Sequence, residues 1–165
     1  MIREAVASDD AAVGELLVRA FVGMYSKKLP DVVVGEQRKA DLRAVAEKRA
    51  VAKVWVAQDE AGQITGTVAL WPPGAEGSEA WLPNAFDLRH LAIADEARGT
   101  GLGDALCDVA ENFARARKGS AVCLHVRREA GGVARLYLAR GYKRAPEGDL
   151  DLLPDVFLEA YWLKL

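Results

Sequence analysis

The residues of this chain best suited to chemistry lie in the run Arg98-Gly99-Thr100-Gly101-Leu102-Gly103, in which three glycines fall within five positions. Glycine has no Cβ, so its backbone N–H groups can face outward, and the run opens a predicted helix whose positive end favours anions. Arg98 is always charged and adds a fork of donors for phosphate oxygens. The run therefore predicts a cradle for a diphosphate, and the alternative is an ordinary tight turn with a solvated arginine.

Two other phosphate-binding motifs fit this run poorly. A Walker A loop needs Lys and then Ser or Thr after its last glycine, whereas Asp104 follows Gly103. A dinucleotide-binding fingerprint needs a third glycine or Ala, but the position holds Asp104 or Leu106, depending on the first glycine counted. Arg127-Arg128 also stand where an acidic residue is expected. Nucleoside triphosphate hydrolysis is therefore not supported, and an NADP-dependent reductase is kept as an alternative.

The predicted elements on either side position the glycine run. A strand over 86–93 precedes it, and a helix that begins at Leu102 follows, with apolar residues at helical spacing as far as Phe113. Alternation assigns the side chains of the strand to two faces. One face carries Phe86, Leu88, His90 and Ala92, and the other carries Asp87, Arg89, Leu91 and Ile93.

Strands and helices also alternate in the rest of the chain. The predicted elements are a short opening strand, a helix with Ser8 as its N-cap, a second helix over 35–52, hairpin strands over 54–57 and 64–70, a loop over 71–84, a strand over 121–126, a helix over 133–140 closed by Gly141, and a final strand over 157–165. This order predicts the α/β or α+β class with a mixed sheet.

Length and composition limit the possible functions. The chain of 165 residues is expected to form one domain over 1–165, and its 51% hydrophobic content supports a packed core. A net charge of −2 provides no general basic field, so neither nucleic acid nor a membrane surface is an expected partner. The two cysteines form no CxxC pair, and together with the absence of a leader-like start this favours a cytoplasmic protein.

Two motifs carry a resemblance to a known family. The run Leu88-Arg89-His90-Leu91-Ala92-Ile93, followed by Arg98, Gly101 and Gly103, resembles the acyl-CoA signature of the GNAT N-acetyltransferases. The run Ala134-Arg135-Leu136-Tyr137 with Gly141-Tyr142 resembles the second landmark of that family. With the element order, the resemblance covers nearly the whole chain.

The resemblance implies a fold and a cofactor. It implies a mixed, mostly antiparallel sheet flanked by helices, whose fourth and fifth strands splay apart to admit the pantetheine arm of acetyl-CoA. The residues it assigns to the cofactor are Leu91, Ala92 and Ile93 for the arm and thioester, Arg98, Gly99, Thr100, Gly101, Leu102 and Gly103 for the pyrophosphate, and Arg135, or Arg127 and Arg128, for the 3′-phosphate. One departure is Gly131, where many members carry an Asn that contacts the pantetheine or a sheet bulge.

The resemblance also implies direct transfer of an acetyl or short acyl group from acyl-CoA to a primary amine in a ternary complex. Tyr137 matches the position of a phenol that protonates the departing thiolate. The candidate bases for the amine are Asp87, His90 and Glu79, or a water wire. His125 and both cysteines are expected to pack in apolar surroundings, with no acyl-enzyme.

The acceptor is expected to be a small-molecule or peptide amine, and no metal site is expected. Aromatic and acidic residues suited to a cationic amine are Tyr25, Trp71, Trp81, Asp87 and Glu79, which are equally explained as core edges or a homodimer interface. The alternative function on the same fold is a noncatalytic acyl-CoA-binding or regulatory module.

Overall fold

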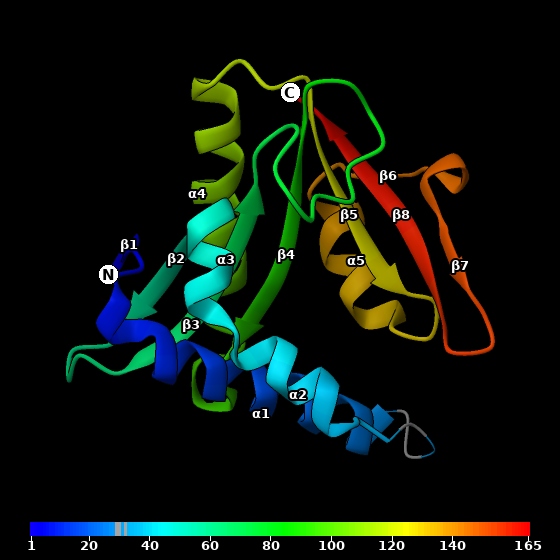
Figure 1. Cartoon of the computed structure of the whole chain (residues 1–165). Helices are drawn as coiled ribbons and strands as arrows, with labels where there is room; N and C mark the ends of the chain where they lie inside the picture. The colour runs from blue at the N-terminus through cyan, green and yellow to red at the C-terminus, as the bar shows by residue number, and fades with distance from the viewer. Residues whose placement is uncertain (29–30, 32) are drawn as a thin grey trace. The chain divides into compact units, whose positions relative to one another are not determined.

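The computed structural model describes residues 1–28, 31 and 33–165 (Figure 1). Its strands are β1 (Ile2–Glu4), β2 (Lys53–Gln58), β3 (Ile64–Trp71), β4 (Ala85–Ile93), β5 (Ala121–Arg127), β6 (Lys143–Arg144), β7 (Leu150–Leu152) and β8 (Val156–Lys164). Its helices are α1 (Asp10–Lys28), α2 (Glu36–Arg43), α3 (Val45–Val51), α4 (Leu102–Ala116) and α5 (Gly131–Ala139). Single 3-10 turns cover Ala7–Asp9, Asp95–Ala97 and Pro146–Gly148.

Within the described residues, the strands form one eight-stranded mixed sheet. Its order is β1-β2-β3-β4-β5-β8-β6, and β7 pairs with β8 outside this path. Most pairings are antiparallel, whereas β4 and β5 run parallel, with Ala85–Asp87 beside Ala121–Cys123. The predicted class, a mostly antiparallel mixed sheet flanked by helices, is confirmed. The splaying of β4 and β5 beyond these pairs stays a prediction.

Two compact units divide the chain. The first unit comprises Met1–Leu70 and His90–Ala110, and the second comprises Trp71–Arg89 and Glu111–Leu165. Both β4 and α4 are therefore divided: the start of β4 and the end of α4 belong to the second unit.

In the first unit, α1 buries its predicted apolar stripe. Val13, Leu16 and Leu17 are buried, as expected from their helical spacing. Leu42 of α2 and Val45 of α3 are also buried, and both of these helices contact α1. This unit also contains the antiparallel strands β1, β2 and β3, and the predicted hairpin of β2 and β3 is confirmed.

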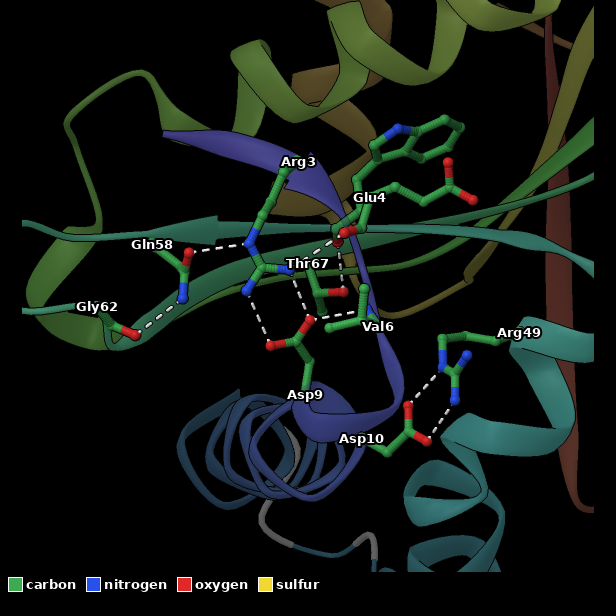
Figure 2. A network of polar contacts seen from close by, with 10 residues as sticks. Arg3, Glu4, Val6, Asp9, Asp10, Arg49, Gln58, Gly62 and Thr67 are labelled. Carbon is green, nitrogen blue, oxygen red and sulfur yellow. Dashed lines mark hydrogen bonds and ion pairs between the residues drawn. The ribbon is translucent and has the colours of Figure 1, made fainter.

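The start of α1 differs from the predicted N-cap at Ser8. A 3-10 turn over Ala7–Asp9 precedes the helix, and the Asp9 carboxylate accepts the Val6 N–H at 2.8 Å. The same carboxylate accepts two hydrogen bonds from Arg3, at 2.7 and 2.9 Å (Figure 2). The acceptor that organises this start is therefore Asp9, and the prediction for Ser8 is wrong. The hydrogen bond from Arg3 is the main reason that the pKa of Asp9 lies below its ordinary value.

The predicted helix over 35–52 is two helices. Ala44 lies between α2 and α3 with φ −74° and ψ 57°, which interrupts the helical backbone. Ion pairs join both segments to α1: Arg43 Nε lies 2.7 Å from Glu15 Oε1, and Arg49 bonds both oxygens of Asp10 at 2.6 and 2.7 Å (Figure 2). The break allows each helix to meet α1 separately.

In the second unit, β5 is bordered by strands on both sides. All seven of its residues pair with β8, and its first three also pair with β4. The predicted strand over 121–126 and the predicted final strand are confirmed as β5 and β8. The strands β6 and β7 are not predicted from the sequence, because they are two and three residues long and each pairs with β8.

The strand β4 departs from strict alternation at His90, whose φ of +58° lies in the left-handed region. Phe86 packs edge to face on Phe113 of α4, with ring centroids 6.3 Å apart. Ile93 also lies toward α4, because a Cβ at Gly103 would be 3.9 Å from its Cγ1. The left-handed backbone at His90 interrupts the alternation on which the predicted faces of the whole strand depend.

Candidate active site

The predicted glycine turn between β4 and α4 is present in the first unit. Gly99 has φ +73° and Gly101 has φ +82°, values in the left-handed region that side chains disfavour. A Cβ added at either position would meet no atom within 4 Å, so the space beside this backbone is open. The backbone of the turn is accessible at both glycines, and its phosphate-binding role stays a prediction.

The start of α4 provides donors for an anion. The Ala105 N–H donates to the Gly101 carbonyl at 3.0 Å, which closes the first turn of the helix. The N–H groups of Leu102 and Gly103 precede that bond and have no acceptor within the helix. Thr100 Oγ1 donates to the Ala97 carbonyl at 2.6 Å and so stabilises the turn. This end of α4 carries the positive end of the helix dipole.

Arg98 is the cation of the turn. Its Nη2 lies 3.1 Å from Asp95 Oδ1, and the two side chains are 52% and 72% exposed. An ion pair so exposed contributes little to stability, so Arg98 can exchange Asp95 for a phosphate at small cost. A cavity of about 480 Å³ lies beside the turn, lined by Asp59, Thr65, Glu96, Ala97, Thr100, Gly101, Leu102 and Ala105. Because two carboxylates line this cavity, a diphosphate at the turn needs a cation such as Arg98.

Gly66 of β3 lets the start of α4 approach the sheet. A Cβ at this position would lie 2.9 Å from Leu106 Cδ1, 3.1 Å from Leu102 Cδ2 and 3.2 Å from Ile93 Cδ1. Such contacts are tighter than side chains normally tolerate. The missing side chain therefore allows the turn and the first residues of α4 to pack directly on β3.

The predicted pantetheine-binding residues Leu91, Ala92 and Ile93 end β4. Ala92 is buried, whereas Leu91 and Ile93 are half-buried. The Ala94 N–H that follows donates to the Thr65 carbonyl at 2.8 Å, which ties this end of the strand to β3. The structure places these residues directly before the glycine turn, and their contact with a cofactor stays a prediction.

In the second unit, Arg89 joins β4 to the loop that precedes it. Its Nε and Nη2 donate to Asp87 Oδ2 at 2.7 and 2.5 Å, and its Nη1 lies 3.0 Å from Glu79 Oε1. It also donates to the Gly77 carbonyl, and its guanidinium lies 4.4 Å from the centre of a Trp71 ring. Three residues expected to suit a cationic amine, Trp71, Glu79 and Asp87, therefore surround a cation of the chain itself.

His125 of β5 packs against the same loop. Its Nε2 lies 2.7 Å from the Gly148 carbonyl, and its Nδ1 lies 3.9 Å from Glu79 Oε2. The Trp81 ring packs on it edge to face, with centroids 5.3 Å apart. Gly148 is required beneath that indole, because a Cβ there would lie 2.4 Å from two ring atoms. His125 packs in the unit, as expected, but both of its ring nitrogens face polar groups.

Tyr137, the candidate acid, lies on α5 and is 5% exposed. Its ring packs edge to face on Tyr142, with centroids 5.4 Å apart. The Tyr142 hydroxyl lies 3.1 Å from Glu111 Oε1, and Arg140 bonds both Glu111 oxygens at 3.1 and 2.8 Å. The buried polar groups of Glu111 and Arg140 therefore hold Tyr142, the ring on which Tyr137 packs.

The other predicted site residues are divided between the two units. His90 belongs to the first unit, where its ring lies edge to face with Phe21 at 6.3 Å, and Tyr25 lies on α1 of that unit. Arg135 lies on α5 of the second unit, and Gly131 is the first residue of this helix. Glu79 and Asp87 are brought together by Arg89, as described above.

The cysteines are both buried. Burial is the main cause that raises the pKa of Cys123 to about 11, so its thiolate is scarce at neutral pH. Among the described residues, no cluster of three or more His, Cys, Asp or Glu side chains could hold a metal ion. No helix in that part of the chain combines the length and the apolar character that crossing a membrane requires.

Together, the mixed sheet, the glycine turn after β4 and the helix that it opens define a GNAT-type fold. A family model described as an acetyltransferase (GNAT) domain matches residues 50–144, more than half of the chain. This chain belongs to the GNAT acetyltransferase family. Comparison with curated proteins gave no match.

Solved structures share the fold over the whole chain. A GNAT-family acetyltransferase from Staphylococcus aureus Mu50 has a TM-score of 0.78 at 16% identity and covers 100% of this chain and 98% of its own. The PaiA N-acetyltransferase from Thermoplasma acidophilum, in complex with coenzyme A, has a TM-score of 0.72 at 15% identity, with coverage of 100% and 98%. A ribosomal-protein-alanine N-acetyltransferase from Brucella melitensis has a TM-score of 0.66 at 20% identity, with coverage of 100% and 99%.

Sequence reasoning assigned no role to Arg89, which is central to the loop and β4. One signal was available. Trp71, Glu79 and Asp87 together favour a cation, and Arg89 is the basic residue on the predicted face of Asp87. The hypothesis that these residues bind an external amine, one of the alternatives left open by the sequence, leaves out the cation that the chain itself supplies.

Proposed function

We propose that this chain transfers an acetyl or other short acyl group from acyl-CoA directly to a primary amine. Membership of the GNAT acetyltransferase family supports acyl transfer from CoA. The observation that carries the proposal is the open glycine turn at the start of α4, with positive φ at Gly99 and Gly101 and an exposed Arg98 beside it. Backbone donors, a helix N-terminus and a guanidinium together match the chemistry of a diphosphate.

In this proposal the residues from 91 to 103 hold acyl-CoA. The N–H groups of Gly99 to Gly103 and the side chain of Arg98 bind the pyrophosphate. The main chain of Leu91, Ala92 and Ile93 binds the pantetheine arm, and Arg135 is assigned to the 3′-phosphate. Gly131 has no side chain to contact the arm, so binding depends more heavily on the turn.

The chemical step needs a good electrophile, a neutral amine and a proton for the leaving group. Acyl-CoA supplies the activated acyl carbon as a thioester. Backbone N–H groups near the end of β4 are assigned to the thioester oxygen, where negative charge develops in the transition state. Tyr137 donates its phenolic proton to the departing sulfur, which a neutral phenol can do because a thiolate is basic. Much of the rate gain comes from orienting amine and thioester.

Acetyl-CoA binding and transfer are tested separately. Saturating acetyl-CoA is expected to raise the melting temperature, because a ligand that binds the folded state stabilises it. Transfer is measured as free CoA thiol released in the presence of a panel of primary amines. A protein with no response to CoA esters would contradict the proposal, whereas binding without turnover would favour the noncatalytic acyl-CoA-binding module.

A further inference from the structure

Glu79 and His125 present two facing proton acceptors in the second unit. Glu79 Oε2 and His125 Nδ1 are 3.9 Å apart, which is too long for a direct hydrogen bond. The other carboxylate oxygen of Glu79 is held by Arg89 Nη1 at 3.0 Å, and Arg89 is itself anchored by Asp87. Glu79 is therefore fixed with one oxygen directed at the imidazole.

The hydrogen bond to Gly148 determines the tautomer of His125. A carbonyl oxygen only accepts hydrogen bonds, so Nε2, at 2.7 Å from the Gly148 carbonyl, must carry the proton. In the neutral ring, the lone pair then lies on Nδ1 and faces Glu79 Oε2. Two acceptors cannot satisfy each other, so the arrangement requires a shared donor such as a proton, a water or an ammonium N–H.

Among the described residues, the groups given as contacts of the His125 ring include no cation. The loop contributes Glu79 and the Trp81 ring, the 3-10 turn contributes the Gly148 carbonyl, and β8 contributes Ala160 as the strand partner. Close to Ala160, Asp149 accepts the Ala160 N–H and pairs with Arg144, which also pairs with Glu159. Arg89 is engaged by Asp87 and Glu79. The facing acceptor atoms of Glu79 and His125 are therefore suited to a donor that carries positive charge.

Glu79 and His125 differ in their exposure to solvent. His125 lies two residues beyond Cys123, the last β5 residue paired with β4, and so on the same face of the strand. Its side chain is 6% exposed, whereas that of Glu79 is 37% exposed. Glu79 is therefore the member of the pair open to solvent and able to pass a proton outward.

We propose that Glu79 and His125 form the amine site of the transferase, with Glu79 holding the substrate ammonium and His125 Nδ1 accepting its proton. This inference rests on the proposed function. The N–H bond of the ammonium breaks, its electron pair stays on the amine nitrogen, and the proton forms a new bond to Nδ1. The resulting imidazolium pairs with Glu79 and returns its proton to solvent through that carboxylate. The neutral amine then forms the C–N bond while the C–S bond breaks, and the departing thiolate takes the proton of Tyr137. The second proton that the nitrogen loses as the amide forms restores the phenol of Tyr137 through solvent.

The test uses His125→Gln, because the Gln amide can still donate to the Gly148 carbonyl while the Nδ1 acceptor is lost. Acetylation of putrescine, an Nα-acetylated lysine peptide and a peptide with a free α-amine is followed from pH 6 to 10. At pH 7, His125→Gln is expected to lower kcat/KM about 100-fold with an unchanged melting temperature. The loss is expected to shrink above pH 9, because more of the free amine is already neutral. A pH profile parallel to that of the wild type would overturn the proposal.

Glu79→Gln separates binding of the ammonium from a structural role. This change keeps the shape of the side chain and removes its charge, so KM for the amine is expected to rise about 10-fold or more, whereas binding of acetyl-CoA stays constant. Glu15→Gln is the matched control, because Glu15 also pairs with an arginine, Arg43, on an exposed surface. A loss of acetyl-CoA binding in Glu79→Gln equal to its loss of activity would contradict the assignment.

The tautomer can be observed without any activity. The chain has two histidines, so long-range ¹⁵N spectra of ¹⁵N-histidine protein resolve both rings. His125 is expected as the Nε2–H tautomer at pH 7.5 and with altered Nδ1 shifts in Glu79→Gln. An Nδ1–H tautomer would overturn the proposed pair. Failure of the proposed function is distinguishable, since it would appear as a wild type that neither binds acetyl-CoA nor acetylates any of the three amines.

Discussion

Arg89 donates two hydrogen bonds to one oxygen of Asp87, from Nε at 2.7 Å and from Nη2 at 2.5 Å. Asp87 is fully buried, so this pair neutralises a carboxylate that water cannot reach. The remaining donors of Arg89 bind Glu79 and the Gly77 carbonyl and hold the loop on β4. We therefore assign Asp87 to the positioning of Arg89, whereas the proposed proton acceptor is His125.

Removal of the Tyr137 hydroxyl tests the proposed general acid. Tyr137→Phe keeps the ring that packs on Tyr142, so the fold and the binding of acetyl-CoA are expected to be preserved. Without a proton for the departing thiolate, kcat is expected to fall about 100-fold. Steady-state kinetics beside calorimetric titration with acetyl-CoA check this, and an unchanged kcat would transfer the acid role to another group.

Loss of the Arg98 side chain tests the diphosphate site. Arg98→Ala is expected to weaken CoA binding about 10-fold to 100-fold, since hydrogen bonds to charged groups contribute about 1.5–3 kcal/mol. Stability is expected to change little, because the Arg98 pair with Asp95 is exposed. Arg115→Ala, at another exposed arginine near the far end of α4, is the control. Equal Kd values for CoA in both variants would argue against phosphate binding at the turn.

A methyl group beneath Trp81 tests the packing at Gly148. In Gly148→Ala, the new Cβ would overlap ring atoms of Trp81, so the indole must move, at an expected cost of about 1–3 kcal/mol in the free energy of unfolding. Urea denaturation measures the change. Gly23→Ala is the comparison, and it is expected to raise the free energy of unfolding. Gly23 lies inside α1 with open space at its Cβ position, and Ala is a better helix former than Gly. Equal effects of both changes would show that Trp81 can be displaced freely.

The Asp9 carboxylate predicts a dependence of stability on pH. Its pKa is lowered on folding, mainly by hydrogen bonds from Arg3, so the unfolded chain binds the proton more tightly. The stabilisation from this group is fully present above the ordinary carboxyl pKa of about 3.9 and is lost as pH falls through the lowered folded value. Asp9→Asn is therefore expected to destabilise the chain most at pH 7 and progressively less below pH 4. Urea denaturation at pH 7, 4 and 3 follows this difference, and a constant difference would contradict it.

Local signals made the turn and most elements predictable. Gly99 and Gly101 adopt positive φ, which glycine tolerates whatever the rest of the fold does. The strands of the hairpin, β5, β8 and the stripe of α4 were also predictable, because periodicity reports burial directly. By contrast, nothing about Ala44 signals a break, since alanine is the strongest helix former. The non-helical backbone of Ala44 is explained by the separate contacts that α2 and α3 make with α1.

The parts that sequence reasoning missed depend on residues distant in the chain. His90 is not a residue type that demands positive φ, so the interrupted alternation within β4 has no local signal. The pairing of Glu79 with His125 joins a loop to a strand 46 positions later, and the tautomer of His125 depends on a carbonyl at Gly148. Only the tertiary fold could bring these groups together.

The buried state of Cys107 and Cys123 has a practical consequence. A thiol-reactive dye added at neutral pH meets almost no thiolate on the folded chain, because Cys123 ionises only near pH 11 and both side chains are shielded from solvent. Colour from such a dye therefore reports product with little background from the protein. The rate of any slow labelling of Cys123 would in turn measure how often β5 becomes transiently exposed to solvent. The same reagent therefore measures both turnover and local opening of the sheet.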